Sequence, residues 1–149
     1  MTKEIWDEII KNGAYIQELD WFATDINGNI GVFSAVMNAQ IPESVKASYD
    51  NYIRLNRWIE SLPLFTSAIL TTSEAGDFSS WILYAEKGLF AFDFQDIHRL
   101  KPKKQYDLIA RPVNPLNINN LVISVDTLAA FAKLDCDFAS VNISTELSL

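Results

Sequence analysis

The sequence contains one cysteine, Cys136, and one histidine, His98. An internal disulfide needs two cysteines, and a structural zinc site needs about four Cys or His ligands. A serine or cysteine nucleophile would have to use His98 as its base, and no serine stands in a Gly-x-Ser-x-Gly motif. Asp135 and Asp137 flank Cys136 and would raise its pKa if they lie close to it. We therefore expect no disulfide, no metal centre and no catalytic residue.

Glycine is also scarce, and the five glycines are scattered: Gly13, Gly28, Gly31, Gly76 and Gly88. Nucleotide-binding loops need several closely spaced glycines so that backbone amides can approach a phosphate. Neither a Walker-type nor a Rossmann-type spacing is present, so we expect no cofactor.

No run of about 18 consecutive apolar residues occurs, and the chain opens with Thr-Lys-Glu-Ile-Trp-Asp after Met1. A secretory signal would instead place a basic segment before an apolar one. With a single cysteine as well, the sequence predicts a cytoplasmic protein with no membrane partner.

Positive charge is in deficit, with 12 Lys or Arg against 19 Asp or Glu and a formal net charge of −7. Such a charge repels nucleic acid and anionic lipid. Residues 1–98 hold six basic and fourteen acidic side chains, whereas residues 99–149 hold six and five. We expect an acidic face on the first two-thirds of the chain, and no nucleic-acid partner.

What is present is an ordinary globular composition: 149 residues, 49% hydrophobic and 21% charged. A chain of this length buries roughly two-thirds of the surface that its unfolded form exposes, which is enough for one core. We expect a single domain over residues 1–149.

Apolar residues at three- and four-residue steps predict helices. The first runs from a Thr2 cap to Asn12, with Gly13 as the stop. The others are expected at 43–62, ended by Pro63, at 77–87 between an Asp77 cap and Gly88, and at 126–134. A hairpin turning at 86–88 is the alternative for the third.

Strands are expected at 14–24, 30–36, 65–72, 89–94, 105–111 and 138–143. The first two form a hairpin that turns at Asn27-Gly28. No regular strand–helix–strand rhythm is seen, so we predict an α+β fold whose mostly antiparallel sheet packs against two to four helices.

Carboxylates are the plentiful reactive groups. Glu18, Asp20 and Asp25 flank the first hairpin, and Asp93 and Asp96 follow an aromatic strand. If these edges were adjacent, they could bind a divalent cation or act as an acid/base pair. Side chains of this kind in an acidic protein are also common as turn formers and solvated surface groups.

Trp21 and Phe22 are consecutive on a strand, so we expect one of them to face away from the core. An exposed aromatic beside carboxylates is a suitable anchor for a partner protein. The candidate partner-binding residues are Asp20, Trp21, Asp25, Asp93 and Asp96.

Four positive side chains cluster within six residues of this acidic chain. One interpretation is a solvated surface loop, and the other is a small anion site. The candidate residues for the anion site are His98, Arg99, Lys101, Lys103 and Lys104.

The hairpin segment 20–33, the segment 87–93 and the tripeptide 110–112 together resemble a group of small uncharacterised bacterial proteins. That group shares a Trp-Phe-Ala-x-Asp-x-x-Gly-x-Ile-Ala-x-Phe hairpin and a later Gly-Leu-Tyr/Phe-x-Tyr/Phe-Asp strand. This chain has Gly31 where the group often has Ala. Some proteins of this kind are immunity proteins that neutralise toxins, so the resemblance implies an immunity function as one interpretation.

Three hypotheses follow. The first is a non-enzymatic protein-binding domain whose acidic surface attracts a basic partner. The second is a small carboxylate-based enzyme or a domain that binds a ligand or divalent metal. The third is a subunit whose aromatic residues form a homodimer interface.

Overall fold

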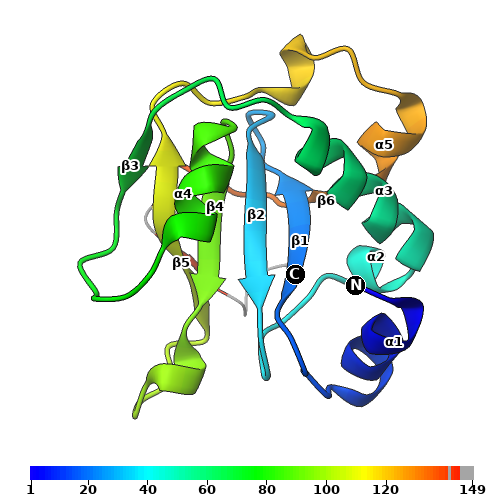
Figure 1. Cartoon of the computed structure of the whole chain (residues 1–149), viewed down its shortest axis with the longest axis vertical. Coiled ribbons are helices and arrows are strands. Elements are labelled where there is room, and N and C mark those ends of the chain that lie inside the picture. The colour runs from blue at the N-terminus through cyan, green and yellow to red at the C-terminus, as the bar shows by residue number, and fades with distance from the viewer. Residues whose placement is uncertain (141, 145–149) are drawn as a thin grey trace.

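The computed structural model in Figure 1 describes residues 1–140 and 142–144. A mixed sheet has the strand order β3-β5-β4-β2-β1-β6, and β7 pairs with β5. The strands are β1 (Leu19–Thr24), β2 (Ile30–Ala35), β3 (Ala68–Leu70), β4 (Phe90–Phe94), β5 (Gln105–Pro112), β6 (Ala132–Lys133) and β7 (Asn142–Ser144). The predicted α+β class is confirmed.

The prediction of a mostly antiparallel sheet is wrong, because the sheet is mixed. β2 and β4 are parallel neighbours, as are β1 and β6. The chain leaves β2, passes through three helices and β3, and then re-enters the sheet as β4. A long crossover of this kind returns a strand in the same direction, whereas a hairpin reverses it.

The helices in the described residues are α1 (Lys3–Asn12), α2 (Glu43–Lys46), α3 (Tyr49–Ser61), α4 (Ser79–Glu86) and α5 (Val125–Ala130), with 3-10 turns η1 (Asp96–His98) and η2 (Ile118–Asn120). As predicted, α1 begins after Thr2, whose side chain accepts the N–H of Ile5, and ends at Gly13 with φ of 66°.

The number of α-helices in the described residues is five, more than the two to four predicted, partly because the predicted helix 43–62 is divided into α2 and α3. Ser48 has an extended backbone, with φ of −149°, and its hydroxyl accepts the N–H of Asn51 at 3.1 Å. This arrangement is an N-cap, so Ser48 separates α2 from α3.

The remaining elements were predicted with varying accuracy. The helix predicted at 77–87 is present as α4 rather than as a hairpin, but it begins at Ser79 with Phe78, not Asp77, at the cap position, and Gly88 follows it with φ of 96°. The strand predicted at 65–72 is confined to β3, and the helix predicted at 126–134 ends at Ala130. In place of the strand predicted at 138–143 the structure has β7, which begins at Asn142. Val141, within the predicted strand, lies outside the described residues.

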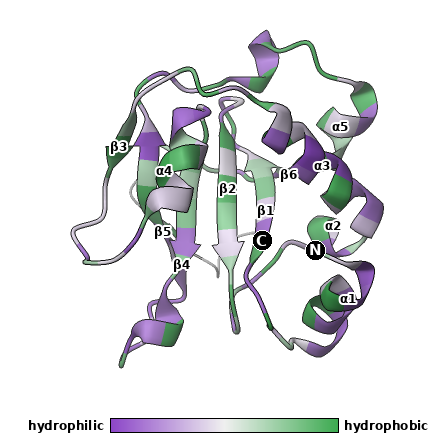
Figure 2. Cartoon of the chain, viewed as in Figure 1, coloured by the Kyte–Doolittle hydropathy of each residue, from purple (hydrophilic) through white to green (hydrophobic). Residues whose placement is uncertain are grey.

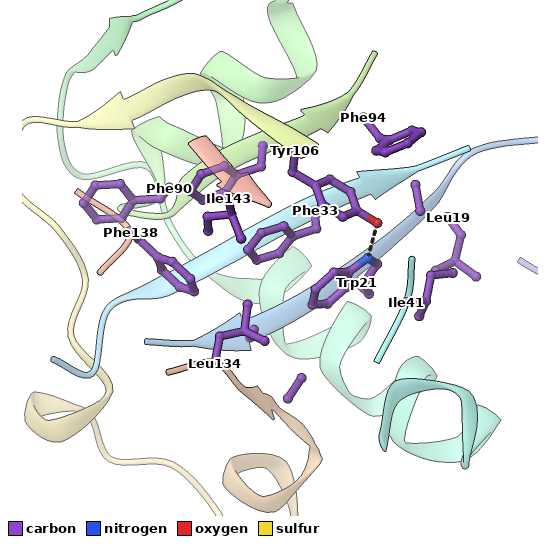
Figure 3. Packing of buried hydrophobic residues seen from close by; sticks show 14 of the residues in the cluster. Leu19, Trp21, Phe33, Ile41, Phe90, Phe94, Tyr106, Leu134, Phe138 and Ile143 are labelled. Carbon is purple, nitrogen blue, oxygen red and sulfur yellow. Dashed lines mark hydrogen bonds between the residues drawn. The ribbon is translucent and has the colours of Figure 1, made fainter. Parts of the chain in front are cut away.

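One face of the sheet carries an aromatic core (Figure 3). The rings of Trp21 and Phe33 stack at 4.3 Å, and those of Phe33 and Phe92 stack at 4.7 Å. The indole N–H of Trp21 donates to the hydroxyl of Tyr106 at 3.2 Å. Phe138 is fully buried against these rings.

The opposite face carries a second core under α3 and α4, which includes Phe22, Val32, Leu55 and Ile59. Trp21 and Phe22 are therefore both buried, with 1% and 2% of their surfaces exposed. The expectation that one of them faces solvent is wrong, because it assumed a sheet covered on only one side.

Candidate functional site

Four polar side chains form a row across the four strands β1, β2, β4 and β5, near one end of these strands. Asp20 on β1 lies opposite Ser34 on β2, and Ser34 lies opposite Asp93 on β4. Asp93 in turn lies opposite Asp107 on β5. Residues directly opposite one another project from the same face of a sheet. Three carboxylates and a hydroxyl are therefore gathered into one row, which we call the carboxylate row.

Asp20 ends the row and is held by two hydroxyl groups. Ser34 Oγ donates to one carboxylate oxygen at 2.6 Å, and the hydroxyl of Tyr84 on α4 donates to the other at 2.8 Å. Burial raises the pKa of Asp20. Burial and the nearby Asp20 also raise the pKa of Tyr84, so the phenol stays protonated and remains a donor. These contacts place the row on the face that α4 covers.

Asp93 lies between other carboxylates, and only 9% of its surface is exposed. Burial, followed by the negative charges of Glu18, Asp20 and Asp107, raises its pKa to about 7. The guanidinium of Arg99 contacts Asp107 and Asp96 instead. Asp93 therefore exchanges a proton near neutral pH, unlike an ordinary aspartate.

Glu18 and His98 lie near the same end of the sheet. Burial and the charge of Asp20 raise the pKa of Glu18, and the nearby His98 opposes this rise. His98 of the basic loop thus lies near the acidic side chains Glu18 and Asp20 at the end of the carboxylate row.

The structure brings together only two of the five proposed partner-binding residues, Asp20 and Asp93. Trp21 is buried in the aromatic core on the opposite face. Asp25 is buried at the other end of β1. Its carboxylate accepts the N–H groups of Asn27, Asn29 and Phe138, so it holds the hairpin turn against the later segment.

Asp96 and the basic segment form a loop that projects from the sheet between β4 and β5 (Figure 1). The two carboxylate oxygens of Asp96 accept the backbone N–H groups of Lys103 and Lys104 at 2.9 and 2.8 Å. The backbone donors that an external anion could use here are thus bound by the protein's own carboxylate. Lys101, Lys103 and the fully exposed Leu100 lie at the surface of the loop.

A cleft of about 1120 Å³ lies between the start of β1 and the polar side of α3, and Asp20 forms part of its wall. Three further carboxylates, Glu18, Asp50 and Glu60, line it together with Arg54 and Arg57. None of these five side chains forms an ion pair with another described residue. The cleft therefore presents uncompensated charge, with carboxylates in excess.

The sequence analysis missed Ser34, Tyr84 and Asp107, as well as the cleft itself. Ser34 and Asp107 had a detectable signal, because each is a polar residue inside an otherwise mainly apolar strand. Tyr84 had none, because only packing of α4 on the sheet brings its hydroxyl to Asp20.

No group of three or more His, Cys, Asp or Glu side chains within residues 1–140 and 142–144 is arranged to hold a metal ion. Cys136 is half-buried, and burial followed by the charges of Asp25, Asp137 and Asp135 raises its pKa to about 11. Its thiol is therefore protonated at neutral pH and a poor nucleophile. In the same residues, no helix is long and apolar enough to cross a membrane.

Comparison of the chain with protein-family models, with curated proteins and with solved structures gives no match.

Proposed function

We propose that this protein binds a basic partner protein, and that the cleft beside α3 receives the partner's positively charged side chains. The observation that carries the proposal is the cleft's set of carboxylates without intramolecular partners: Glu18, Asp50 and Glu60. Complementary charge speeds association and excludes partners of the wrong sign.

The polar, mixed-charge lining of the cleft is also suited to binding a protein. The outer side of α3 is largely hydrophilic (Figure 2), and Arg54 and Arg57 stand among the acidic side chains. Mixed charges of this kind select a partner whose own charges are arranged in a matching pattern, rather than any polycation. Neutralising a toxin, as the resemblance implies, is one function that such binding would serve.

The alternative of a carboxylate-based enzyme has support from Asp93, which titrates near neutral pH. However, Asp93 is not among the residues that line the cleft. Ligand in the cleft would meet Asp20 and Glu18 first. We therefore favour protein binding.

The test compares two variants that remove the same charge from different places. The cleft variant carries Glu18→Gln, Asp50→Asn and Glu60→Gln. The control carries Glu4→Gln, Asp126→Asn and Asp135→Asn, three exposed positions outside the cleft. Immobilised wild-type protein should capture a basic partner from lysate of the source strain in a salt-sensitive manner.

The cleft variant should lose this capture, and the control should retain most of it. Equal losses of capture in both variants would show that capture depends only on the net charge of the protein. Full capture by the cleft variant would show that the partner binds elsewhere. If the partner is toxic, co-expression of wild-type protein and control should restore growth, and co-expression of the cleft variant should not.

A further inference from the structure

The outer strand β3 has an exposed apolar surface that the proposed binding cleft does not use. Ile69 and Leu70 are 44% and 47% exposed, although they belong to a strand. β3 stands at the end of the sheet order, at the left of Figure 1, and is green, hydrophobic, in Figure 2. Nearby apolar side chains are also exposed, namely Leu64, Phe65 and Val113.

The hydrogen bonds to β5 show which backbone groups of β3 face outward. Val113 donates its N–H to the carbonyl of Ser67 at 2.9 Å, and Thr71 donates its N–H to the carbonyl of Ile109 at 2.8 Å. The odd-numbered residues of β3 therefore bond to β5. Because bonding groups alternate along an antiparallel strand, the N–H and C=O groups of Ala68 and Leu70 point away from the sheet.

This outer edge is complementary to itself. If a second copy pairs antiparallel with Ile69 opposite Ile69, then Ala68 of each copy lies opposite Leu70 of the other. All four outward groups of each strand then form hydrogen bonds, and the two Ile69 side chains meet in the close, non-hydrogen-bonded position. A two-fold axis between the Ile69 residues generates this pairing, as in other symmetric dimers.

Charge favours a second copy over a basic partner at this edge. No Asp, Glu, Lys or Arg occurs from Ser61 to Ser73. Two copies with a net charge of −7 repel each other over most of their surfaces, so they can approach most easily through a surface whose strand carries no carboxylate. The charged residue opposite Ile69 on β5 is Arg111, which adds no negative charge. A basic partner would gain nothing electrostatically here. Edge strands of monomers are usually protected by being short or by charged residues, proline or bulges; β3 is short, with three residues, but carries no charge or proline.

From these observations we infer that the protein forms a two-fold symmetric dimer in which β3 pairs with β3 of a second copy and extends the sheet across both subunits.

The register is tested by cross-linking in a Cys136→Ala background, which removes the native thiol. In the inferred pairing, the two Ile69 Cα atoms lie about 4.5 Å apart, whereas the two Leu70 Cα atoms are diagonal neighbours at about 7–8 Å. A disulfide accepts Cα separations of about 4.4–6.8 Å. Under mild oxidation Ile69→Cys should give a covalent dimer, and Leu70→Cys should not. Cross-linking of both variants alike, or of neither, would overturn the inference.

The association itself is tested by sedimentation at micromolar concentrations. Leu70→Pro removes an outward N–H and leaves the bonds to β5 in place, because proline is tolerated at strand edges whose N–H faces solvent. This variant and Ile69→Lys should raise the dimer dissociation constant by roughly tenfold or more, whereas the control Leu100→Lys should not change it. Circular dichroism checks that each variant is folded. A monomeric wild type, or folded variants that dimerise as well as wild type, would contradict the dimer.

Discussion

Asp93 has an environment unlike that of an ordinary surface aspartate. It is buried, it faces Ser34 and Asp107 on the neighbouring strands, and its pKa is about 7. The charged groups that act on it are Glu18 and Asp20 from the start of the hairpin and Asp107 from β5. Arg99 pairs with Asp107, and Tyr84 on α4 donates to Asp20.

This shift has a consequence for stability. An aspartate in the unfolded chain has a pKa of about 3.9, so the folded protein binds the Asp93 proton more tightly between about pH 4 and 7. The contribution of Asp93 to the free energy of unfolding is therefore fully present below about pH 4. It is lost as the pH rises towards 7, where the buried carboxylate becomes charged.

Asp93→Asn keeps the shape and removes the charge. We expect it to raise the free energy of unfolding at pH 8 by on the order of 1 kcal/mol or more, and to have little effect near pH 3, below the pKa of the unfolded chain. Urea unfolding at both values measures this, with Asp126→Asn as an exposed control. A variant less stable than wild type at pH 8 would show that contacts within the fold stabilise the charged carboxylate.

Gly31 lies on β2 at a position where a side chain would collide with the aromatic core. A Cβ atom at this position would lie 2.8 Å from Phe138 Cε2 and 3.0 Å from Phe33 Cε2. The glycine therefore makes room for the buried Phe138 ring.

Gly31→Ala should lower the free energy of unfolding by roughly 1–3 kcal/mol through overpacking. In a Phe138→Leu background the same substitution should cost much less, because the smaller side chain relieves the contact. Urea unfolding of the four proteins in this cycle gives the coupling energy. Additive effects would mean that the two residues do not compete for space.

At the level of elements, the boundary between α2 and α3 depends on one side chain. Ser48→Ala should lower the free energy of unfolding by about 1 kcal/mol, because the N–H of Asn51 loses its acceptor. Ser48→Asp keeps an acceptor and should stay close to wild type. Thermal unfolding of both variants tests this cap, and equal destabilisation by both would contradict it.

Most helices and strands could be predicted from apolar periodicity and turn residues, and the hairpin at Asn27-Gly28 and the stop of α1 at Gly13 show why. Their signals are local, because the backbone angles at Gly13 and Gly28 suit glycine. The brevity of β3 and the end of α5 had no local signal. The length of β3 depends on its pairing with β5. The end of α5 depends on the pairing of the next residues, β6, with β1.

For the molecule as a whole, the α+β class could be predicted but the strand order could not. The crossover from β2 to β4 packs α3 and α4 on one face of the central strands, and Phe138 packs on the other, so Trp21 and Phe22 lie in separate cores. The same crossover aligns Ser34 with Asp93. The sequence shows each polar residue of the carboxylate row, but only the register shows that they are neighbours.

The acidity of the first two-thirds of the chain also becomes more specific in three dimensions. Some acidic side chains are paired, as Asp7 is with Lys3 and Lys11. Others have structural roles, such as Asp25 in the hairpin turn. Three carboxylates of the cleft, Glu18, Asp50 and Glu60, have neither kind of partner, and for that reason we propose that they, rather than net charge alone, bind the partner.

Site-specific photo-cross-linking in cells of the source strain tests this assignment most directly. A photoreactive phenylalanine analogue replaces Arg57 in the cleft or, as a control, the fully exposed Val122 outside it. We expect the cleft position to give one dominant covalent adduct with a basic protein, and the control position to give none. No adduct at Arg57, or the same adduct at both positions, would contradict the proposal that the cleft binds a partner.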